Sequence, residues 1–262
     1  MEDTELPLTA HLQELRTRLS RALLAIIVCF AVCYPLSTRF FDFLTAPLTA
    51  ATSASGTKVE LIGTGVAEAF FTRIKVCAIA ALFLALPVIL YQVWMFIVPG
   101  LKSSEARYAR GFVVAGTFFF LAGAAFCHQV VFPAGFPFFL SEYATIGVTP
   151  NIRIAEYLSF AANMMLAFGV TFELPVVAFF LARAGMITHR TLIGYGRYAI
   201  LVIFIVAAVL TPGPDVASQM LMAAPLLVLY TLSIGIAYVA RRKPTVEAEA
   251  ESRDVVPAEP ES

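Results

Sequence analysis

Charged residues are scarce in this chain. Asp, Glu, Lys and Arg make up 14% of its 262 residues, whereas 60% are hydrophobic, and the mean hydropathy is +0.83. This balance excludes an ordinary soluble domain and predicts a membrane protein. Neither sign of charge is in excess, since 18 basic residues stand against 18 acidic ones. We therefore expect no nucleic-acid partner, because nothing concentrates enough positive charge to neutralise phosphates.

Residues that build metal centres, disulfides and catalytic sites are also few. The cysteines lie in or beside apolar stretches without a CxxC pair, and the histidines lie on separate segments without a second ligand at metal-binding spacing. They are Cys29, Cys33, Cys77, Cys127, His11, His128 and His189. Nucleotide-binding and hydrolase motifs are missing, and neither Ser159 nor Ser218 has a histidine at a similar depth to activate it. We therefore expect no metal, no cofactor and no enzymatic activity.

Six apolar stretches dominate the chain instead, and Glu173 is the one charged residue within them. They are 22–36, 76–101, 111–126 extending towards 132, 157–182, 198–210 and 216–240. All but the fifth reach, or can be extended to, the roughly 20 residues that cross a hydrocarbon layer as a helix. The fifth has only 13 residues between Arg197 and the turn TPGPD (211–215), so it either spans as a short helix or re-enters. The sequence predicts an all-α polytopic fold of six transmembrane helices, the last two forming a short hairpin.

Basic residues predict the orientation of these helices. Thirteen flank the ends that would share a side with both termini, and five flank the opposite ends. The first group is Arg16, Arg18, Arg21, Lys102, Arg107, Arg110, Arg183, Arg190, Arg197, Arg241, Arg242, Lys243 and Arg253, and the second is Arg39, Lys58, Arg73, Lys75 and Arg153. Positive charge is retained on the cytoplasmic side. We therefore expect a multi-pass protein of the cytoplasmic (inner) membrane with both termini in the cytoplasm, and the first helix to be retained rather than cleaved.

The segments outside the apolar stretches are of three kinds. Residues 37–75 form a long loop, expected in the periplasm, whose run RFFDFLTAPL (39–48) favours a short interfacial helix that Pro47 ends or bends. Residues 241–262 are acidic and proline-containing, which predicts a disordered cytoplasmic tail. Residues 1–240 are then one six-helix transmembrane domain.

An amphipathic helix is predicted at about residues 9–20, directly before the first membrane helix. Leucines recur at helical spacing on one face, while Glu14 and Arg18 lie on another. Glu14 precedes Arg18 by four residues, the favourable order for a local ion pair. That pair is one reading of Glu14, and a binding role for its carboxylate is the other.

Glu173 lies in the apolar run FGVTFELPVV (168–177). An ionised carboxylate in hydrocarbon is costly, so the side chain is expected to be neutral or to face a polar partner. A neutral side chain bonded to another helix is one reading, with Thr171 and Asn163 as candidates for the same or an adjacent polar face. Pro175 would loosen the helix two residues later.

Five of these stretches, in order, resemble the twin-arginine protein translocase subunit TatC family. They are HLQELRTRL (11–19), APL (46–48), LPVILYQVWMFIVPGL (86–101) with Glu105 following, YLSFAANMMLAFGVTFELPVV (157–177), and TPGPDVASQ with the later AAPLLVLY (211–230). The resemblance covers nearly the whole apolar part of the chain and matches the six-segment topology. It implies a curved, glove-like bundle that exports folded proteins using the proton gradient.

The resemblance also implies a signal-peptide site. Family members bind signal peptides carrying two adjacent arginines on the cytoplasmic face, and the matching residues here are Glu14, Arg16 and Glu105. Two carboxylates from different segments suit two guanidinium groups, because each pair binds bidentately. This sequence departs from the family before Glu105, where Lys102 and Ser104 stand near the positions of a usual tyrosine and histidine.

Partner sites follow from the same resemblance. The residue matching Glu173 faces the concave surface and is thought to contact the small single-span partners TatA and TatB, so Glu173 is expected to be a docking or bilayer-thinning site. Thr211 and Gln219 match a polar cluster that receives a partner helix. Pro47 and Asp215 match exterior loop positions that matter in the family. Pro47 is expected to terminate the interfacial helix, and Asp215 is expected to cap the sixth membrane helix. Self-association and contact with membrane lipids are also implied.

A proton-coupled secondary transporter of a small solute is the alternative. Such a protein would also bury a carboxyl within a helix. It is expected to carry more intramembrane polar residues and a repeat symmetry, and no internal repeat is evident here.

Overall fold

The structure is a computed structural model that describes residues 8–55, 59–97, 109–183, 185–210 and 216–240. The described chain is almost entirely helical, in keeping with the predicted all-α polytopic fold. Helix α1 (Leu8–Cys33) leads through a short 3₁₀ turn, η1 (Tyr34–Leu36), into α2 (Ser37–Ser55). A strand, β1 (Glu60–Ile62), precedes the long helix α3 (Glu68–Ile97).

The second half of the chain adds the remaining helices. Helix α4 (Ala109–Phe126) continues through a π-helical segment, η4 (Cys127–Val131), into α5 (Phe132–Thr145). Strand β2 (Asn151–Arg153) opens directly into α6 (Ile154–Arg183). A short helix, α7 (His189–Gly194), then leads to α8 (Gly196–Leu210) and α9 (Val216–Ala240).

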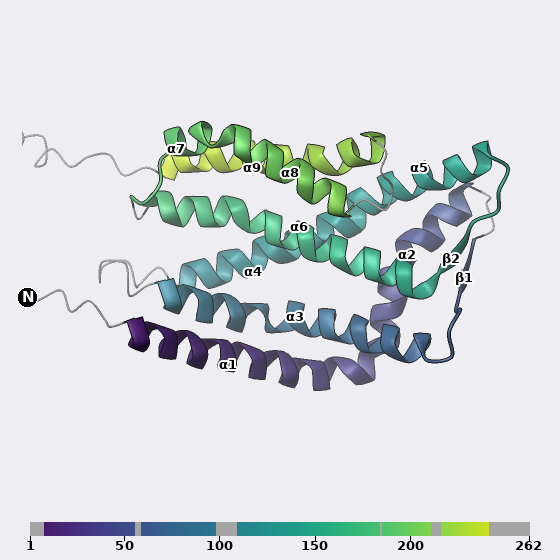
Figure 1. Cartoon of the computed structure of the whole chain (residues 1–262), viewed down its shortest axis with the longest axis horizontal. Coiled ribbons are helices and arrows are strands. Elements are labelled where there is room, and N and C mark those ends of the chain that lie inside the picture. Colours follow the sequence, from purple (N-terminus) through teal and green to yellow (C-terminus); the bar gives the residue numbers. More distant parts are fainter. Residues whose placement is uncertain (1–7, 56–58, 98–108, 184, 211–215, 241–262) are drawn as a thin grey trace, which may run out of the picture.

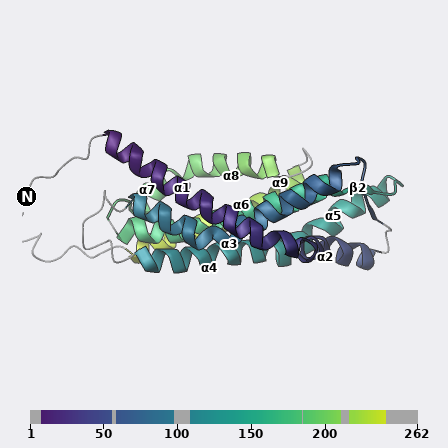
Figure 2. The same cartoon turned by 90° about the horizontal axis from the view of Figure 1, so that it is seen from below.

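The bundle has two distinct ends (Figure 1). The beginning of α1 and the end of α9 lie at one end, which we call the termini end. Strands β1 and β2 lie at the other, the sheet end, where they pair in parallel with Leu61 opposite Ile152. Figure 2 shows α4 and α8 at opposite margins of the bundle with α6 between them, so α6 is the central helix.

Five helical stretches are long and apolar enough to cross a membrane. They are Leu12–Ser53, Glu68–Phe96, Arg110–Thr145, Ile154–Arg183 and Gln219–Ala240. The fifth predicted segment is the shorter apolar helix α8, whose 15 residues extend the 13 expected from the sequence by two. Helix α1 packs mainly against α3, and many of its large apolar side chains are exposed, among them Leu19, Leu23 and Ile27, so it forms one edge of the bundle.

Close contact between α4 and α6 holds the centre together. A Cβ added at Gly123 would lie 2.6 Å from the backbone oxygen of Phe168 and 2.7 Å from Cγ of Phe172. Only glycine fits at position 123, because any side chain there would clash with the backbone of α6. The crossing therefore sets the distance between the two halves of the bundle.

Pro47 does not terminate its helix, and that prediction is wrong. Helix α2 passes through Pro47 and continues to Ser55. Proline lacks the N–H that would bond the carbonyl four residues earlier, but the ring nitrogen Nε2 of His128 contacts the oxygen of Phe43 at 2.8 Å. The Tyr157 hydroxyl donates to the next carbonyl, that of Leu44, at 2.7 Å. A tertiary partner thus satisfies the carbonyl that the proline frees, and a second one bonds the carbonyl next to it.

Two helix boundaries also differ from the apolar stretches. Helix α3 begins at Glu68 rather than near residue 76, because its first turns carry charges that find partners: Arg73 donates to the Ser37 hydroxyl at 2.6 Å and Lys75 to the Ser159 hydroxyl at 2.8 Å. The third apolar stretch continues past residue 132 to Thr145. The wider π-helical turn η4 comes just before Pro133, where an α-helical turn would bring the proline ring against a carbonyl.

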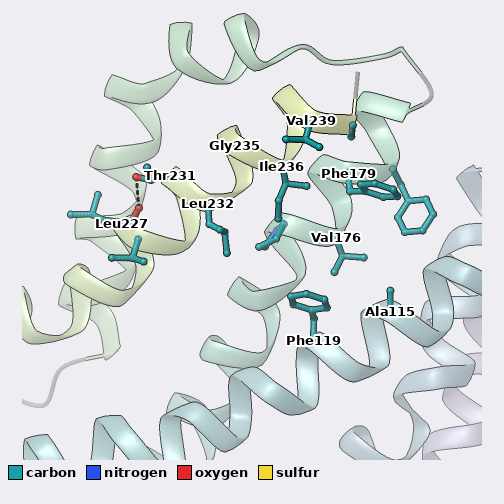
Figure 3. Close-up of a pocket in the computed structure, with 14 residues that line it drawn as sticks. Ala115, Phe119, Val176, Phe179, Leu227, Thr231, Leu232, Gly235, Ile236 and Val239 are labelled. Carbon is teal, nitrogen blue, oxygen red and sulfur yellow. Dashed lines mark hydrogen bonds between the residues drawn. The ribbon is translucent and has the colours of Figure 1, made fainter. Parts of the chain in front are cut away.

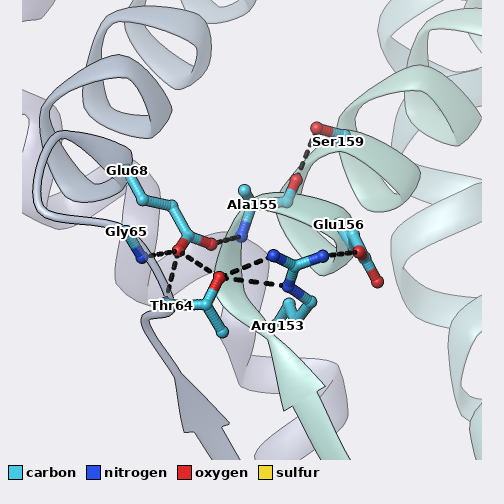
Figure 4. A network of polar contacts seen from close by, with 7 residues as sticks. All are labelled: Thr64, Gly65, Glu68, Arg153, Ala155, Glu156 and Ser159. Atoms are coloured by element: carbon cyan, nitrogen blue, oxygen red, sulfur yellow. Dashed lines mark hydrogen bonds and ion pairs between the residues drawn. The ribbon is translucent and has the colours of Figure 1, made fainter.

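A polar network closes the sheet end (Figure 4). The Glu68 carboxylate accepts the backbone N–H groups of Thr64 and Gly65 before α3, and the N–H of Ala155 in the first turn of α6 at 3.2 Å. Arg153 donates to the Thr64 hydroxyl at 2.7 Å and to the Glu156 carboxylate at 2.9 Å. One carboxylate at the start of α3 therefore caps α6 and ties the beginnings of the two helices together.

Candidate functional site

The predicted signal-peptide residues on the first helix lie at the termini end. Glu14 and Arg18 form the expected ion pair, in which Arg18 donates through Nε at 2.9 Å and also through Nη2 to the same oxygen, Oε1. The pair lines a shallow polar depression of about 320 Å³ together with Gln13, Thr17 and Arg21. Glu14 thus presents a carboxylate that already holds a guanidinium group while its side chain stays 23% exposed.

Of the other two predicted signal-peptide residues, the structure describes Arg16 but not Glu105. Arg16 is exposed on α1, and its side chain forms neither a hydrogen bond nor an ion pair with the described part of the chain. Glu105 lies outside the described residues. The described part of the site is therefore the face of α1 that carries Glu14. Arg16, two residues further along, has no ion pair with the described residues.

Glu173 lies on α6 at its contact with α3 and α4. A Cβ added at Gly116 of α4 would lie 3.0 Å from Glu173 Oε2 and 2.8 Å from Leu90 Cδ1 of α3. Both carboxylate oxygens are buried and have no hydrogen-bond partner among the described residues. Because a buried polar group without a partner is unfavourable, this carboxyl retains its full capacity to bind an incoming polar group.

Neither Thr171 nor Asn163, the candidates for a polar face with Glu173, bonds to its carboxyl. The Thr171 hydroxyl donates to the carbonyl of Ala167 in its own helix at 2.7 Å. Asn163 is exposed and stands ten residues from Glu173, about 15 Å along the helix. Hydroxyl groups on helices commonly bond back to their own helix, and this local choice could not be read from the shared apolar run.

A large apolar groove opens between α4, α6 and α9 (Figure 3). Its volume is about 1060 Å³, and its lining is almost wholly hydrophobic. The labelled walls include Ala115 and Phe119 of α4, Val176 and Phe179 of α6, and Leu232 and Val239 of α9. Val176 follows Glu173 by three residues on α6, so Glu173 stands about one helical turn from the groove, on the side away from the termini end, and is not part of the lining.

The predicted polar cluster at the α8–α9 hairpin is described only in part. Gln219 lies in the first turn of α9, where its amide Nε2 donates to the carbonyl of Phe204 of α8 at 3.0 Å. Helix α9 begins at Val216, directly after the predicted cap Asp215, and both Asp215 and Thr211 lie outside the described residues. Gln219 therefore joins the two helices of the hairpin.

Sequence reasoning missed the network around Glu68 altogether. A weak signal was present, because a threonine four residues and a glycine three residues before a glutamate at a helix start come close to a capping box. The second half of the network, from Arg153 and Ala155, is 87 or more positions further along the chain. Such a pairing depends on the parallel strands, which no local pattern predicts.

Comparisons with known proteins agree with the fold. The family model "Sec-independent protein translocase protein (TatC)" matches residues 10–225. A TatC protein of Desulforapulum autotrophicum is 45% identical over 97% of this chain and 93% of its own length. One of Carboxydothermus hydrogenoformans is 41% identical over 90% of this chain and 95% of its own.

A solved structure is also similar. The crystal structure of a twin-arginine translocase receptor, TatC, superposes with a TM-score of 0.79 at 35% identity, over 88% of this chain and 100% of that chain. The family is one of translocase components and not of enzymes, and nothing in these comparisons supports a proton-coupled secondary transporter. This six-segment helical membrane protein belongs to the TatC family of Sec-independent protein translocase subunits.

Proposed function

We propose that this chain is the receptor subunit of a twin-arginine translocase and binds twin-arginine signal peptides at its termini end. The observation that carries the proposal is the Glu14 carboxylate on α1, which sits in a polar depression and holds a guanidinium group. Glu105, carried by the segment between α3 and α4, is the proposed second carboxylate, and Arg16 completes the site. Membership in the TatC family supports this assignment.

Arginine rather than lysine fits such a site for a physical reason. A guanidinium group is planar and donates along two parallel directions to a carboxylate, whereas an ammonium group acts as a strongly hydrated point charge. Arg18 uses two of its nitrogens on one oxygen of Glu14. A signal-peptide arginine would take Arg18's place on the same carboxylate, or use the second oxygen beside it.

Photo-crosslinking tests this site. A photoreactive residue beside Glu105, with membranes containing a precursor protein, is expected to give adducts with a twin-arginine signal peptide and few with a twin-lysine version. Glu14→Gln and Glu105→Gln are each expected to lower the yield. Adducts that are indifferent to both the arginines and the two carboxylates would contradict the proposal.

The same proposal assigns a docking role to the α4–α6–α9 groove. Helices of TatA- and TatB-like single-span proteins present apolar faces, and the groove offers an apolar wall of matching kind beside the unpaired Glu173 carboxyl. Gln219 and Thr211 would contact a partner at the α8–α9 hairpin. Cysteines at Val239 and along a partner helix are expected to form disulfides at helical spacing. Disulfides without this periodicity would contradict a docking role for the groove.

Orientation, domain organisation and energy source complete the proposal. The basic residues favour a cytoplasmic-membrane protein whose termini end faces the cytoplasm, with residues 1–240 as one domain and 241–262 as an acidic tail. Transport of folded proteins would draw on the proton gradient, together with partner subunits and self-association of the receptor. A membrane-impermeant thiol reagent tests the orientation, since Gln13→Cys is expected to react only from the cytoplasmic side.

A further inference from the structure

A second apolar groove lies at the sheet end between α2, α3 and α6. Its volume is about 400 Å³, and it differs from the first groove because an arginine, Arg39, forms part of its lining. The other walls come from apolar side chains, among them Phe43 of α2, Val76 and Phe83 of α3, and Met165 of α6. Phe43 remains 48% exposed, so the groove opens on the outer surface of the bundle.

Arg39 is the exception among the basic residues described at the sheet end. Arg73 donates to Ser37, Lys75 donates to Ser159, and Arg153 bonds both Thr64 and Glu156. Arg39 is exposed, and the structure gives it neither a hydrogen bond nor an ion pair with any described residue.

The nearest acidic residue does not neutralise Arg39. Asp42 stands one turn along α2 and lines a different depression, beside Ser37 and Arg73. The ion pairs of the described chain are Arg18 with Glu14 and Arg153 with Glu156. An unpaired guanidinium group beside an apolar groove suits an anion with an apolar body.

The depth of the groove selects the kind of anion. Arg39 follows the last apolar residue of the first stretch by only a few positions, which places it near the membrane interface. Val76 and Phe83 are eight and 15 residues beyond the start of α3 at Glu68. These two wall residues therefore lie about 12 and 22 Å along the helix from Glu68, towards the bundle centre. The charged mouth and the apolar interior thus match the head and tail of a lipid.

We propose that the α2–α3–α6 groove binds one anionic phospholipid, with an acyl chain between α2, α3 and α6 and its phosphate against Arg39. A guanidinium group pairs with phosphate through parallel hydrogen bonds. A net anionic lipid is preferred over a zwitterionic one, because the latter carries its own cation beside the phosphate. The site is separate from the termini end and does not depend on signal-peptide binding.

Native mass spectrometry of the purified full chain tests the site with phosphatidylglycerol and phosphatidylcholine of identical acyl chains. The wild-type protein is expected to retain one phosphatidylglycerol in preference to phosphatidylcholine. Arg39→Gln is expected to weaken phosphatidylglycerol binding by about tenfold, as for loss of a charge-assisted pair, and to leave phosphatidylcholine binding nearly unchanged. Arg183→Gln, which removes an exposed arginine at the other end of the bundle, is the matched control and is expected to change neither.

A second pair of variants tests the apolar part of the groove. Ala80 lines it, whereas Ala78 is exposed on another face of the same helix. Ala80→Phe is expected to weaken binding of both lipids, and Ala78→Phe to leave both unchanged, with circular dichroism confirming that each variant is folded. Equal effects of Arg39→Gln and Arg183→Gln, or lipid binding unchanged by Ala80→Phe, would overturn the proposal. Loss of a single-span partner from Ala80→Phe with lipid binding intact would also overturn it and assign the groove to a protein.

Discussion

The two ends of this bundle differ in whether their charged side chains bond to other parts of the molecule. At the sheet end, three of the four described basic side chains bond to other elements of the molecule, namely Arg73, Lys75 and Arg153, and the Glu68 carboxylate does so too. At the termini end, the described pair of Glu14 and Arg18 is local to one helix.

The exposed arginines of the termini end make the same contrast. Arg16, Arg183 and Arg190 form no ion pair with the described residues. Charges used inside a structure hold its parts in place, whereas charges left free are available to a ligand. The charges of the sheet end therefore hold helices together, as a clamp, and those of the termini end are available to a ligand, as a binding face. Arg39 is the one described sheet-end cation without such a bond.

The largest effect is expected where both ends depend on the same contact. Gly123→Leu would push a side chain into the backbone oxygen of Phe168, 2.6 Å from the added Cβ, and is expected to destabilise the bundle by more than about 3 kcal/mol. Immunoblots of membranes are expected to show little protein. Gly111→Leu is the control, since its Cβ would meet nothing closer than 3.9 Å, and equal loss from both variants would contradict the role given to the α4–α6 crossing.

Glu14 and Glu156 offer a direct contrast between the ends, because each pairs with an arginine in its own sequence neighbourhood. Glu14→Gln is expected to weaken binding of a twin-arginine signal peptide by roughly tenfold or more, since the peptide loses a charge-assisted partner. Glu156→Gln is expected to leave that binding unchanged. Fluorescence titration of the purified chain with a labelled peptide measures both, and equal weakening would argue against a binding face at one end only.

Tyr157 tests the way the chain accommodates Pro47. Its buried hydroxyl donates to the Leu44 carbonyl at 2.7 Å. Tyr157→Phe is expected to lower the free energy of unfolding by about 1 kcal/mol, because the bond is lost and the carbonyl is left buried. Denaturant unfolding in detergent measures the change. Tyr143→Phe, at an exposed tyrosine of α5, is expected to have no effect, and a wild-type value for Tyr157→Phe would mean that the hydroxyl does not support the helix.

The clamp at the sheet end is expected to give the smallest of these effects, because its groups are reached by solvent. Glu68→Gln leaves an amide where a carboxylate accepts N–H groups from the turn before α3 and from α6, so it is expected to lower the midpoint of thermal unfolding. Glu60→Gln changes an exposed carboxylate on β1 and is expected to lower it less. Signal-peptide affinity is expected to stay unchanged in both, and a loss of affinity in Glu68→Gln would couple the two ends.

Much of this fold is readable from apolar run length alone. Six apolar stretches predicted the membrane helices, and their order placed the beginning of α1 and the end of α9 together. The i,i+4 spacing predicted the Glu14–Arg18 pair, which is confirmed. Local rules succeeded there because the partners are local, and a long apolar helix is determined by the hydrocarbon around it.

Local rules failed where distant segments supply a partner. Pro47 remains inside a helix because His128 contacts the carbonyl of Phe43, and α3 extends back to Glu68 because Arg73 and Lys75 find hydroxyl groups elsewhere. Glu173 shows the opposite case, since its predicted polar neighbours bond elsewhere or lie too far away. These outcomes depend on tertiary geometry, which periodicity does not carry.

Crosslinking from the two ends in parallel separates a signal-peptide site at the termini end from binding at both ends. A photoreactive residue is placed at Gln13 of α1 and, separately, at Gly63 after β1, in membranes containing a precursor with a twin-arginine signal peptide. The account predicts signal-peptide adducts from Gln13 that disappear when the two arginines are changed to lysines, and none from Gly63. Equal adducts from both positions, or adducts at Gln13 that survive the change to lysine, would contradict it.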